Sequence, residues 1–252
     1  MPKVKNIRDL TLVELDSENI LVIACDSLGA IGSKAADRVA TSGKVVGRCT
    51  VRVPLLEIMA AGAVPLVIIN TLSVEMDPTG KEILQGISQE LEVSGLTDVT
   101  VTGSTEENMP TVQTGVGITV IGKASAATLR LGRARAGDIV YCVGKPKVGT
   151  EVLTGPLPDV PLLEKLLQQA WVHEILPVGS KGVLDEARQL ATTAGYDFHL
   201  AADPGLDVHK SAGPATSLLV AASTKAKKKL QELTSLDVYQ VGTIKSVTLA
   251  PK

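Results

Sequence analysis

Residues 20–32 read ILVIACDSLGAIG, and this stretch decides how the first half of the chain folds. Six apolar residues, from Ile20 to Cys25, run without a break into Asp26, and serine and glycine follow. A short apolar run bounded by turn-forming residues is typical of a buried strand. The stretch therefore predicts a buried strand that ends on a carboxylate and opens into a glycine-containing segment.

The composition is that of a globular chain with both helices and strands. Its 252 residues suffice for two domains with sizeable cores. Apolar residues make up 44% of the chain but aromatic residues only 2%, so the core consists of Val, Leu, Ile and Ala. A core of this kind suits sheets that are covered by helices. We therefore expect an α/β (α+β) fold.

Charge, hydropathy and cysteine usage exclude several classes of protein. The net charge is −2, which is unlike the basic footprint of a nucleic-acid binder. No apolar run approaches the ~20 residues of a membrane helix, and the first residues do not form a signal peptide. The three cysteines are far apart and form no CxxC motif, which favours reduced thiols. We expect a cytoplasmic protein without nucleic-acid or membrane partners.

Periodicity in the first half predicts alternating strands and helices. Strands are expected at 10–15, 20–25, 64–74, 98–102 and 114–122, and helices at 44–63 and 81–93. Gly62 and Gly95 stand where these helices would end, and Pro54 predicts a kink or a break in the first helix.

The second half has the same alternation. Strands are expected at 139–144, 171–177, 198–202 and 217–222, helices at 162–170, 182–194 and 225–233, and a hairpin-like stretch at 238–249. A polar, basic segment at 130–138 separates the two halves. The predicted domains are therefore residues 1–135 and residues 136–252.

Candidate functional residues lie at the ends of these predicted elements. The chain has neither the phosphate loop GxxxxGK[ST] nor a GxGxxG that follows a strand. Instead, Asp26 ends a strand, Glu57 lies in an apolar helix, and GSTEE at 103–107 follows the strand at 98–102. Carboxylates so placed can hold Mg²⁺, which bridges phosphate oxygens in phosphoryl transfer.

Purely structural roles remain open for the same residues. Asp26 has the residue type of a turn former, and Glu57 fits the solvent side of an amphipathic helix. Ser104 and Thr105 fit a helix N-cap, and Glu107 would complete a capping box with Ser104.

Eight segments follow one another along the chain in the order ACDSLG, VGR, LLEIMAAGAVPL, VTGSTEENMP, GVGITVIG, ARAGDIVYCVG, VHEILPVG and SAGPATSLLV. This series of segments resembles the PurM-like (aminoimidazole ribonucleotide synthetase-like) superfamily, and the resemblance extends over nearly the whole chain. The resemblance implies two α/β domains. The N-terminal domain would bind ATP and Mg²⁺ and pair in a homodimer through its β-sheet, and the C-terminal domain would cover the substrate.

The resemblance also implies roles for individual residues. Asp26 matches the family's strand-end Asp, and Glu57 takes the place of a helix Asp. Either Glu106 or Glu107 would supply an acid that is missing from the family's glycine-acid-threonine turn. These residues would hold Mg²⁺, with Asp26 and Glu57 as the residues on which catalysis depends.

The phosphate-binding residues implied by the resemblance are Gly103, Ser104 and Thr105, with Ser104 in place of the family's acid. Lys34 is within reach of a phosphate, although a surface lysine is the simpler interpretation.

Four residues of the second half also match family motifs: Arg133, Asp138, His173 and Glu174. Glu174 again replaces an Asp. His173 is either a base or a structural histidine at a helix start.

Within the superfamily, the CDSLGAIGSK opening and the Glu-for-Asp changes resemble the alpha-ribazole kinases of cobalamin salvage most closely. The expected activity is ATP-dependent phosphoryl transfer to a nucleoside-like alcohol. The alternatives are a thiamine-monophosphate kinase-like enzyme, a ligase or synthetase, and a hydrogenase-maturation-like protein. The last would need a cysteine near its end, and no cysteine follows Cys142.

Overall fold

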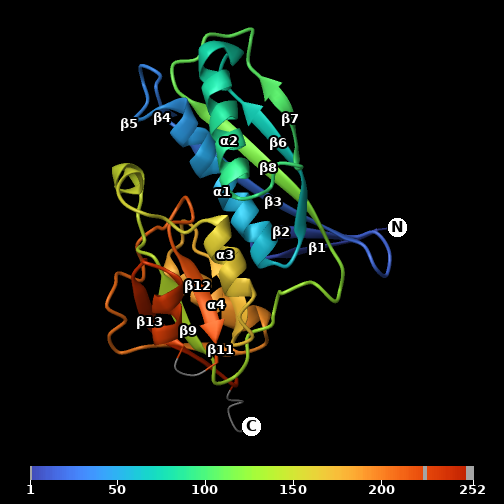
Figure 1. Cartoon of the computed structure of the whole chain (residues 1–252), viewed down its shortest axis with the longest axis vertical. Helices are drawn as coiled ribbons and strands as arrows, with labels where there is room; N and C mark the ends of the chain where they lie inside the picture. Colours follow the sequence, from blue (N-terminus) through green and yellow to red (C-terminus); the bar gives the residue numbers. More distant parts are fainter. Residues whose placement is uncertain (1, 224–225, 248–252) are drawn as a thin grey trace, which may run out of the picture. The chain divides into compact units, whose positions relative to one another are not determined.

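The computed structural model describes residues 2–223 and 226–247, which form two compact units (Figure 1). The first unit is Met1–Leu129 and the second is Arg130–Lys252, a division close to the boundary predicted near Arg135. Each unit combines helices with a β-sheet, which confirms the predicted fold class.

The first unit is built on a six-stranded sheet with the order β1-β2-β3-β8-β6-β7. Its strands are β1 (Lys3–Ile7), β2 (Leu10–Glu14), β3 (Ile20–Gly29), β6 (Val64–Leu72), β7 (Thr100–Thr105) and β8 (Gly115–Ala124). Neighbouring strands are antiparallel, except for β6 and β7, which are parallel. The short strands β4 (Ile31–Gly32) and β5 (Val39–Ala40) pair separately.

Helix α1 (Gly43–Ala60) covers one face of this sheet by packing on β3, β8 and β6. Side chains alternate between the two faces of a strand, so one face can be apolar and buried. Val22, Val120 and Ile68 are fully buried on the face toward the helix. Their neighbours on the other face, such as Ile23 and Ile121, are only half-buried.

Helix α2 (Lys81–Val93), preceded by the single turn η1 (Met76–Gly80), packs mainly on α1. Two glycines make this contact. A Cβ atom on Gly47 would lie 2.0 Å from the carbonyl oxygen of Ile83, and one on Gly86 would lie 2.1 Å from that of Lys44. The two helix backbones are therefore in direct contact, with no room for a side chain between them.

A buried ion pair fixes the same interface. Arg52 on α1 donates from Nε to Oε1 of Glu90 on α2 at 2.6 Å and from Nη2 to Oε2 at 2.8 Å. The side chain of Glu90 is only 1% exposed. Bidentate pairs of this kind have strict geometry, so this one sets the rotation of α2 about its axis.

The second unit has a five-stranded antiparallel sheet with the order β10-β12-β9-β13-β11. Its strands are β9 (Ile139–Val143), β10 (Val172–Pro177), β11 (Asp197–Leu200), β12 (Leu218–Ala222) and β13 (Val238–Lys245). Its helices are α3 (Val160–Leu167), α4 (Val183–Thr193) and α5 (Lys227–Leu233), with a short 3₁₀ turn η2 (Gly149–Leu153). Strand β12, which lies between β10 and the central strand β9, is buried along its whole length.

Most predicted elements are confirmed. The hairpin of β2 and β3 forms, α2 spans the predicted residues 81–93, and Gly62 and Gly95 end their helices with positive φ angles of 81° and 66°. Strand β1 was not predicted. In the described part of the chain, the hairpin expected at 238–249 is the single strand β13; residues 248 and 249 lie outside the described residues. Lys225, the first residue of the predicted helix 225–233, also lies outside them.

The predicted end of a strand at Asp26 is wrong, and of the kink or break predicted at Pro54 the break does not occur. Strand β3 does not end at Asp26 but continues to Gly29, because β8 pairs with it over its full length, up to Gly115. Helix α1 continues through Pro54 without a break, because its packing on the sheet outweighs the one backbone hydrogen bond that proline removes.

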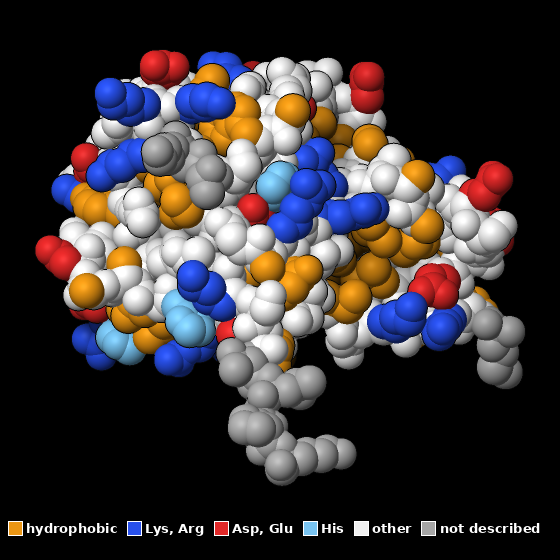
Figure 2. All heavy atoms as spheres, turned by 90° about the horizontal axis from the view of Figure 1, so that it is seen from below, with side chains coloured by type: hydrophobic (Ala, Val, Ile, Leu, Met, Phe, Trp, Pro, Cys, Tyr) orange, Lys and Arg blue, Asp and Glu red, His pale blue; other side chains and the backbone are white. Residues whose placement is uncertain are grey.

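No helix in the described part of the chain is long and apolar enough to cross a membrane. On the face shown in Figure 2, Lys and Arg side chains are interspersed with Asp and Glu and with hydrophobic side chains. This face therefore carries mixed charge, in keeping with the net charge of −2.

The glycine contact between α1 and α2 is testable by adding one methyl group. Gly86→Ala should lower the free energy of unfolding by about 2 kcal/mol in a urea titration, since overpacking outweighs the gain in helix propensity. Gly29→Ala is the matched control, because a Cβ there has no atom within 4 Å. Equal stability of the two variants would contradict the backbone contact.

Candidate functional site: a cavity between helix α2 and strand β7

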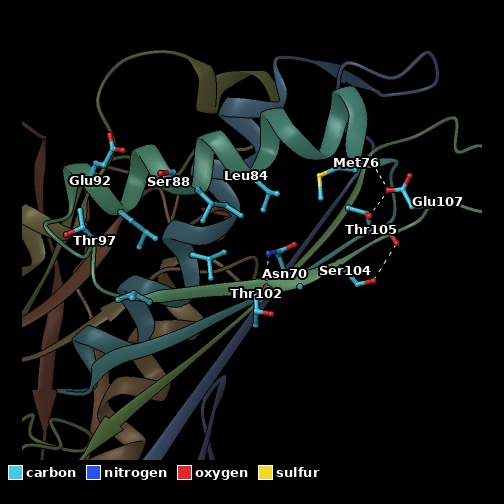
Figure 3. Close-up of a pocket in the computed structure, with 15 residues that line it drawn as sticks. Asn70, Met76, Leu84, Ser88, Glu92, Thr97, Thr102, Ser104, Thr105 and Glu107 are labelled. Carbon is cyan, nitrogen blue, oxygen red and sulfur yellow. Dashed lines mark hydrogen bonds between the residues drawn. The ribbon is translucent and has the colours of Figure 1, made fainter.

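β6, α2 and β7 form a strand-helix-strand unit, and a cavity of about 970 Å³ lies between its helix and its strands (Figure 3). The cavity exists because α2 rests on α1 and not on the strands beneath it. Its volume is in the range of small-molecule sites. It is lined by Asn70, Met76, Leu84, Ile87, Ser88, Leu91, Glu92, Thr97, Val99, Val101, Thr102, Gly103, Ser104, Thr105 and Glu107.

The two ends of the cavity carry different groups of side chains. Thr105, Glu107 and Met76 lie at one end, where β7 finishes and η1 begins (Figure 3). Glu92 and Thr97 lie at the other end, where α2 finishes. In α/β units, ligands bind preferentially at the carboxyl ends of parallel strands, which is the end with Glu107.

Glu107 ties β7 to the turn η1 at this end. Its Oε1 accepts hydrogen bonds from the backbone N–H of Met76 at 2.8 Å and from Oγ1 of Thr105 at 2.7 Å. Glu106, in contrast, accepts from the backbone N–H groups of Asn108 and Met109 and so caps its own loop. The structure thereby distinguishes two acids that the sequence left equivalent, since Glu107 lines the cavity and Glu106 does not.

The residues predicted to bind phosphate belong to a strand and not to a turn. Gly103, Ser104 and Thr105 are the last residues of β7, so the helix N-cap proposed for this segment is wrong. Thr105 points toward Glu107 and Ser104 points the other way, as strand alternation requires (Figure 3). Both residues border the cavity, but only Thr105 points to the side of β7 that faces α2.

Asn70 is a cavity residue that the sequence analysis missed. Its side chain is 4% exposed, and its Nδ2 donates to the carbonyl oxygen of Thr102 at 2.8 Å. A Cβ on Gly103 would lie 2.1 Å from the backbone oxygen of Asn70 and 2.4 Å from its Oδ1, so the close approach of Asn70 explains why residue 103 is glycine. The sequence did contain a signal for it, because Asn70 is a polar residue two positions from both Ile68 and Leu72 and so lies on the same buried face of the strand.

Asp26 lies on the same face of the sheet but at a distance from the cavity. Strand pairing places four residues in one row across β3, β8, β6 and β7: Asp26, Ile118, Asn70 and Gly103. Three strand spacings of about 4.8 Å separate the Cα atoms of the outer two by roughly 14 Å. Asp26 therefore lies at the opposite end of this row from the start of the 103–107 motif.

The Asp26 carboxyl is in an environment that disfavours its charge. Burial raises its pKa to about 6, and a hydrogen bond from the backbone N–H of Ser27 offsets the effect only partly. A half-buried carboxylate with a raised pKa is a candidate functional group, although such shifts also occur at structural positions.

Lys34 is engaged in an ion pair and is not a surface lysine. Its Nζ contacts Oε2 of Glu75, and its side chain is only 14% exposed. Burial raises the pKa of Glu75, but hydrogen bonds from Lys34 and Thr79 outweigh it and bring the pKa to about 2. A phosphate would have to compete with Glu75 for Lys34.

The acids predicted to share one Mg²⁺ do not form a protein-built metal site. Among residues 2–223 and 226–247, no group of three or more His, Cys, Asp or Glu side chains can hold a metal ion. Glu57 is partly buried in the last turns of α1. The metal-binding roles of Asp26, Glu57, and Glu106 or Glu107 therefore stay predictions.

In the second unit, the predicted acids hold backbone segments. Glu174 is fully buried and accepts from the N–H groups of Gly132 at 2.9 Å and Ala134 at 2.8 Å, on either side of Arg133. Asp138 accepts from the N–H of Arg135 and lies 2.8 Å from Nδ1 of His173.

These contacts order the segment that leads into β9. His173 lies within strand β10, so its placement at a helix start is wrong.

Comparison with known proteins places this geometry in a fold family. Residues 8–124 match the family described as "AIR synthase related protein, N-terminal domain". No curated protein sequence matches the chain significantly.

The chain is similar to the crystal structure of thiamine-monophosphate kinase from Stenotrophomonas maltophilia K279a, with a TM-score of 0.67 and 18% identity over 98% of this chain and 89% of that one. It is also similar to E. coli HypE, a hydrogenase maturation protein, with a TM-score of 0.67 and 14% identity over 89% and 80% of the two chains. A third similar structure is AaThiL complexed with AMPPCP and TMP, with a TM-score of 0.59 and 18% identity over 95% and 85%.

The chain therefore has the PurM-like fold. Its residues 8–124 match the model of the AIR synthase related N-terminal domain, which agrees with the resemblance found in the sequence.

The pKa of Asp26 makes stability depend on pH. Because the folded-state pKa is raised from 3.8 to about 6, the ionised carboxylate destabilises the fold, and the wild type loses stability as pH rises from about 4 through 6. Asp26→Asn should remove this loss and stabilise the protein at pH 8 by up to about 3 kcal/mol.

Urea titrations at pH 4 and pH 8 measure this difference, which should shrink toward zero at pH 4. The exposed Asp98 supplies the control, since Asp98→Asn should change stability by less than about 0.5 kcal/mol at both pH values. A pH-independent effect of Asp26→Asn would refute the assignment.

Proposed function

We propose that the protein is an ATP-dependent phosphotransferase that acts on a small-molecule hydroxyl and binds ATP in the cavity between α2 and β7. One observation carries the proposal. Of the residues that the sequence nominated for phosphate and metal, four line this one cavity: Gly103, Ser104, Thr105 and Glu107. The similar structures with bound AMPPCP or ATP support nucleotide binding by this fold.

The charge of the cavity determines how a triphosphate would bind. The described residues that line it include Glu92 and Glu107 but no Lys or Arg. Such a lining cannot neutralise a triphosphate, so the nucleotide must bring its own cation. Mg²⁺ commonly binds through one or two carboxylates together with substrate phosphates and water.

Glu107 and the hydroxyl of Thr105 fit an ion of that kind, although they do not form a complete protein cage. When bound, Mg²⁺ would neutralise charge on the phosphates. The remaining chemistry is positioning, and the N-terminal end of α2, which the helix dipole makes favourable for negative charge, lies at this end of the cavity.

The proposed acceptor is alpha-ribazole, phosphorylated on its ribose 5′-hydroxyl. The resemblance of the CDSLGAIGSK segment to the alpha-ribazole kinases supports this choice. The similar structures include a thiamine-monophosphate kinase and HypE, so thiamine monophosphate is the acceptor to test against it.

We also propose a homodimer through the sheet of the first unit. The face opposite α1 carries apolar side chains that are only half-buried, among them Leu21, Ile23 and Ile121. A second copy would remove them from water.

Glu107 and Glu106 form a matched pair for testing the site. Glu107→Gln should lower kcat for ADP release at least ten-fold with Mg²⁺ and alpha-ribazole present, because a cavity carboxylate is lost. Glu106→Gln should retain wild-type turnover, because Glu106 only caps its loop. Circular dichroism confirms folding, and equal activity of the two variants would refute the site.

The acceptor is tested by ADP release from the wild type. Turnover should appear with alpha-ribazole and stay at background with thiamine monophosphate. Turnover with thiamine monophosphate alone would overturn the proposed acceptor but would support the kinase activity.

A further inference from the structure

We propose that the second unit binds a phosphate monoester through Arg133 and Arg135, on the segment that leads into β9. This site belongs to the second unit alone and uses no residue of the cavity described above. The proposal therefore goes beyond the proposed nucleotide site, and it is tested separately from it.

The segment 130–138 carries three arginines and a single acid, Asp138. Arg130 serves the fold, since its Nη1 and Nη2 donate to backbone carbonyl oxygens at 3.3 Å and 3.4 Å. Arg133 and Arg135 are exposed, whereas Asp138 is buried. The surface of this segment therefore presents two cations and no acid.

Two buried carboxylates hold the backbone that carries these cations. Glu174 is 0% exposed and accepts from the N–H groups of Gly132 at 2.9 Å and Ala134 at 2.8 Å. Asp138 is 3% exposed and accepts from the N–H of Arg135 at 2.8 Å. Taking a carboxylate out of water is unfavourable unless hydrogen bonds compensate for it. Both acids are therefore committed to fixing this segment.

The fixed backbone directs both guanidinium groups to the surface. Ala134, between the two arginines, is 4% exposed and packs in the core of the second unit, so its neighbours on either side point away from that core. Residues two positions apart have Cα atoms that are at most about 7 Å apart. Arginine side chains are long enough to bridge this separation, so both can contact one anion.

A phosphate monoester fits two guanidinium groups better than a carboxylate does. Each guanidinium presents two parallel N–H donors to an oxyanion. A phosphate monoester has three terminal oxygens and a charge of about −1.5 to −2 at pH 7, whereas a carboxylate has two oxygens and one charge. Arg133 also interacts within the chain, so the anion would bind those of its five N–H donors that face solvent.

The buried acids have two opposite effects on such an anion. Their negative charge repels it, while their hydrogen bonds keep the arginines in place and so lower the entropic cost of binding. In the proposed site, the second effect is the larger one.

An NMR titration of the full chain with methyl phosphate at pH 7.5 tests the proposal, with the arginine Nε–Hε resonances as the readout. The resonances of Arg133 and Arg135 should shift in the wild type, and acetate should bind about ten-fold more weakly. Arg133→Gln and Arg135→Gln should each weaken methyl phosphate binding about ten-fold, because charge-assisted hydrogen bonds are lost.

Arg188→Gln is the matched control, since Arg188 is an exposed arginine of the same unit whose only printed neighbour, Asp185, lies 3.6 Å away. This variant should keep the wild-type affinity. Absence of methyl phosphate binding, wild-type affinity in both Arg133→Gln and Arg135→Gln, or an equal loss in Arg188→Gln would overturn the site.

Glu174→Gln separates the effect of the fixed backbone from that of charge. Removal of a negative charge alone would tighten methyl phosphate binding, whereas loss of a backbone hydrogen bond should weaken it about five-fold in protein that circular dichroism shows to be folded. Tighter binding would overturn the role assigned to Glu174. None of these results bears on the nucleotide site of the first unit, which the ADP-release assays test.

Discussion

The direct backbone contact between α1 and α2 is the constraint on which the site of the first unit depends. Gly47 and Gly86 allow the two helices to touch, and the buried pair of Arg52 and Glu90 fixes their rotation. Because α2 is held by α1, it does not settle on β6 and β7. The space that remains is the cavity, so the candidate site is a consequence of helix packing and not of a flexible loop.

The same sheet separates groups that a linear motif would join. Pairing across β3, β8, β6 and β7 puts Asp26 and Gly103 at opposite ends of one row, with Ile118 and Asn70 between them. Asp26 and Gly103 are thus separated by the width of three strand spacings. Asp26 is better described as a separate half-buried carboxylate whose charge disfavours folding at neutral pH.

Much of the fold was predictable because its signals are local. Apolar runs, closing glycines such as Gly62 and Gly95, and turn residues between β2 and β3 each act within a few positions of the chain. The errors occurred where distant pairing decides. The strand partner β8 extends β3 beyond Asp26, and packing on the sheet keeps α1 helical through Pro54.

The candidate site was only partly predictable for the same reason. The motif at 103–107 was identified, but sequence could not show that Glu107 faces the cavity while Glu106 caps its loop. Asn70 lies in another element and reaches the cavity only through the β6-α2-β7 arrangement.

The most direct test of the central claim is a crystal structure of the full chain with Mg²⁺ and a non-hydrolysable ATP analogue. The account predicts density between α2 and β7, with the phosphates beside Thr105 and Glu107. An analogue bound elsewhere, with this cavity empty, would contradict it.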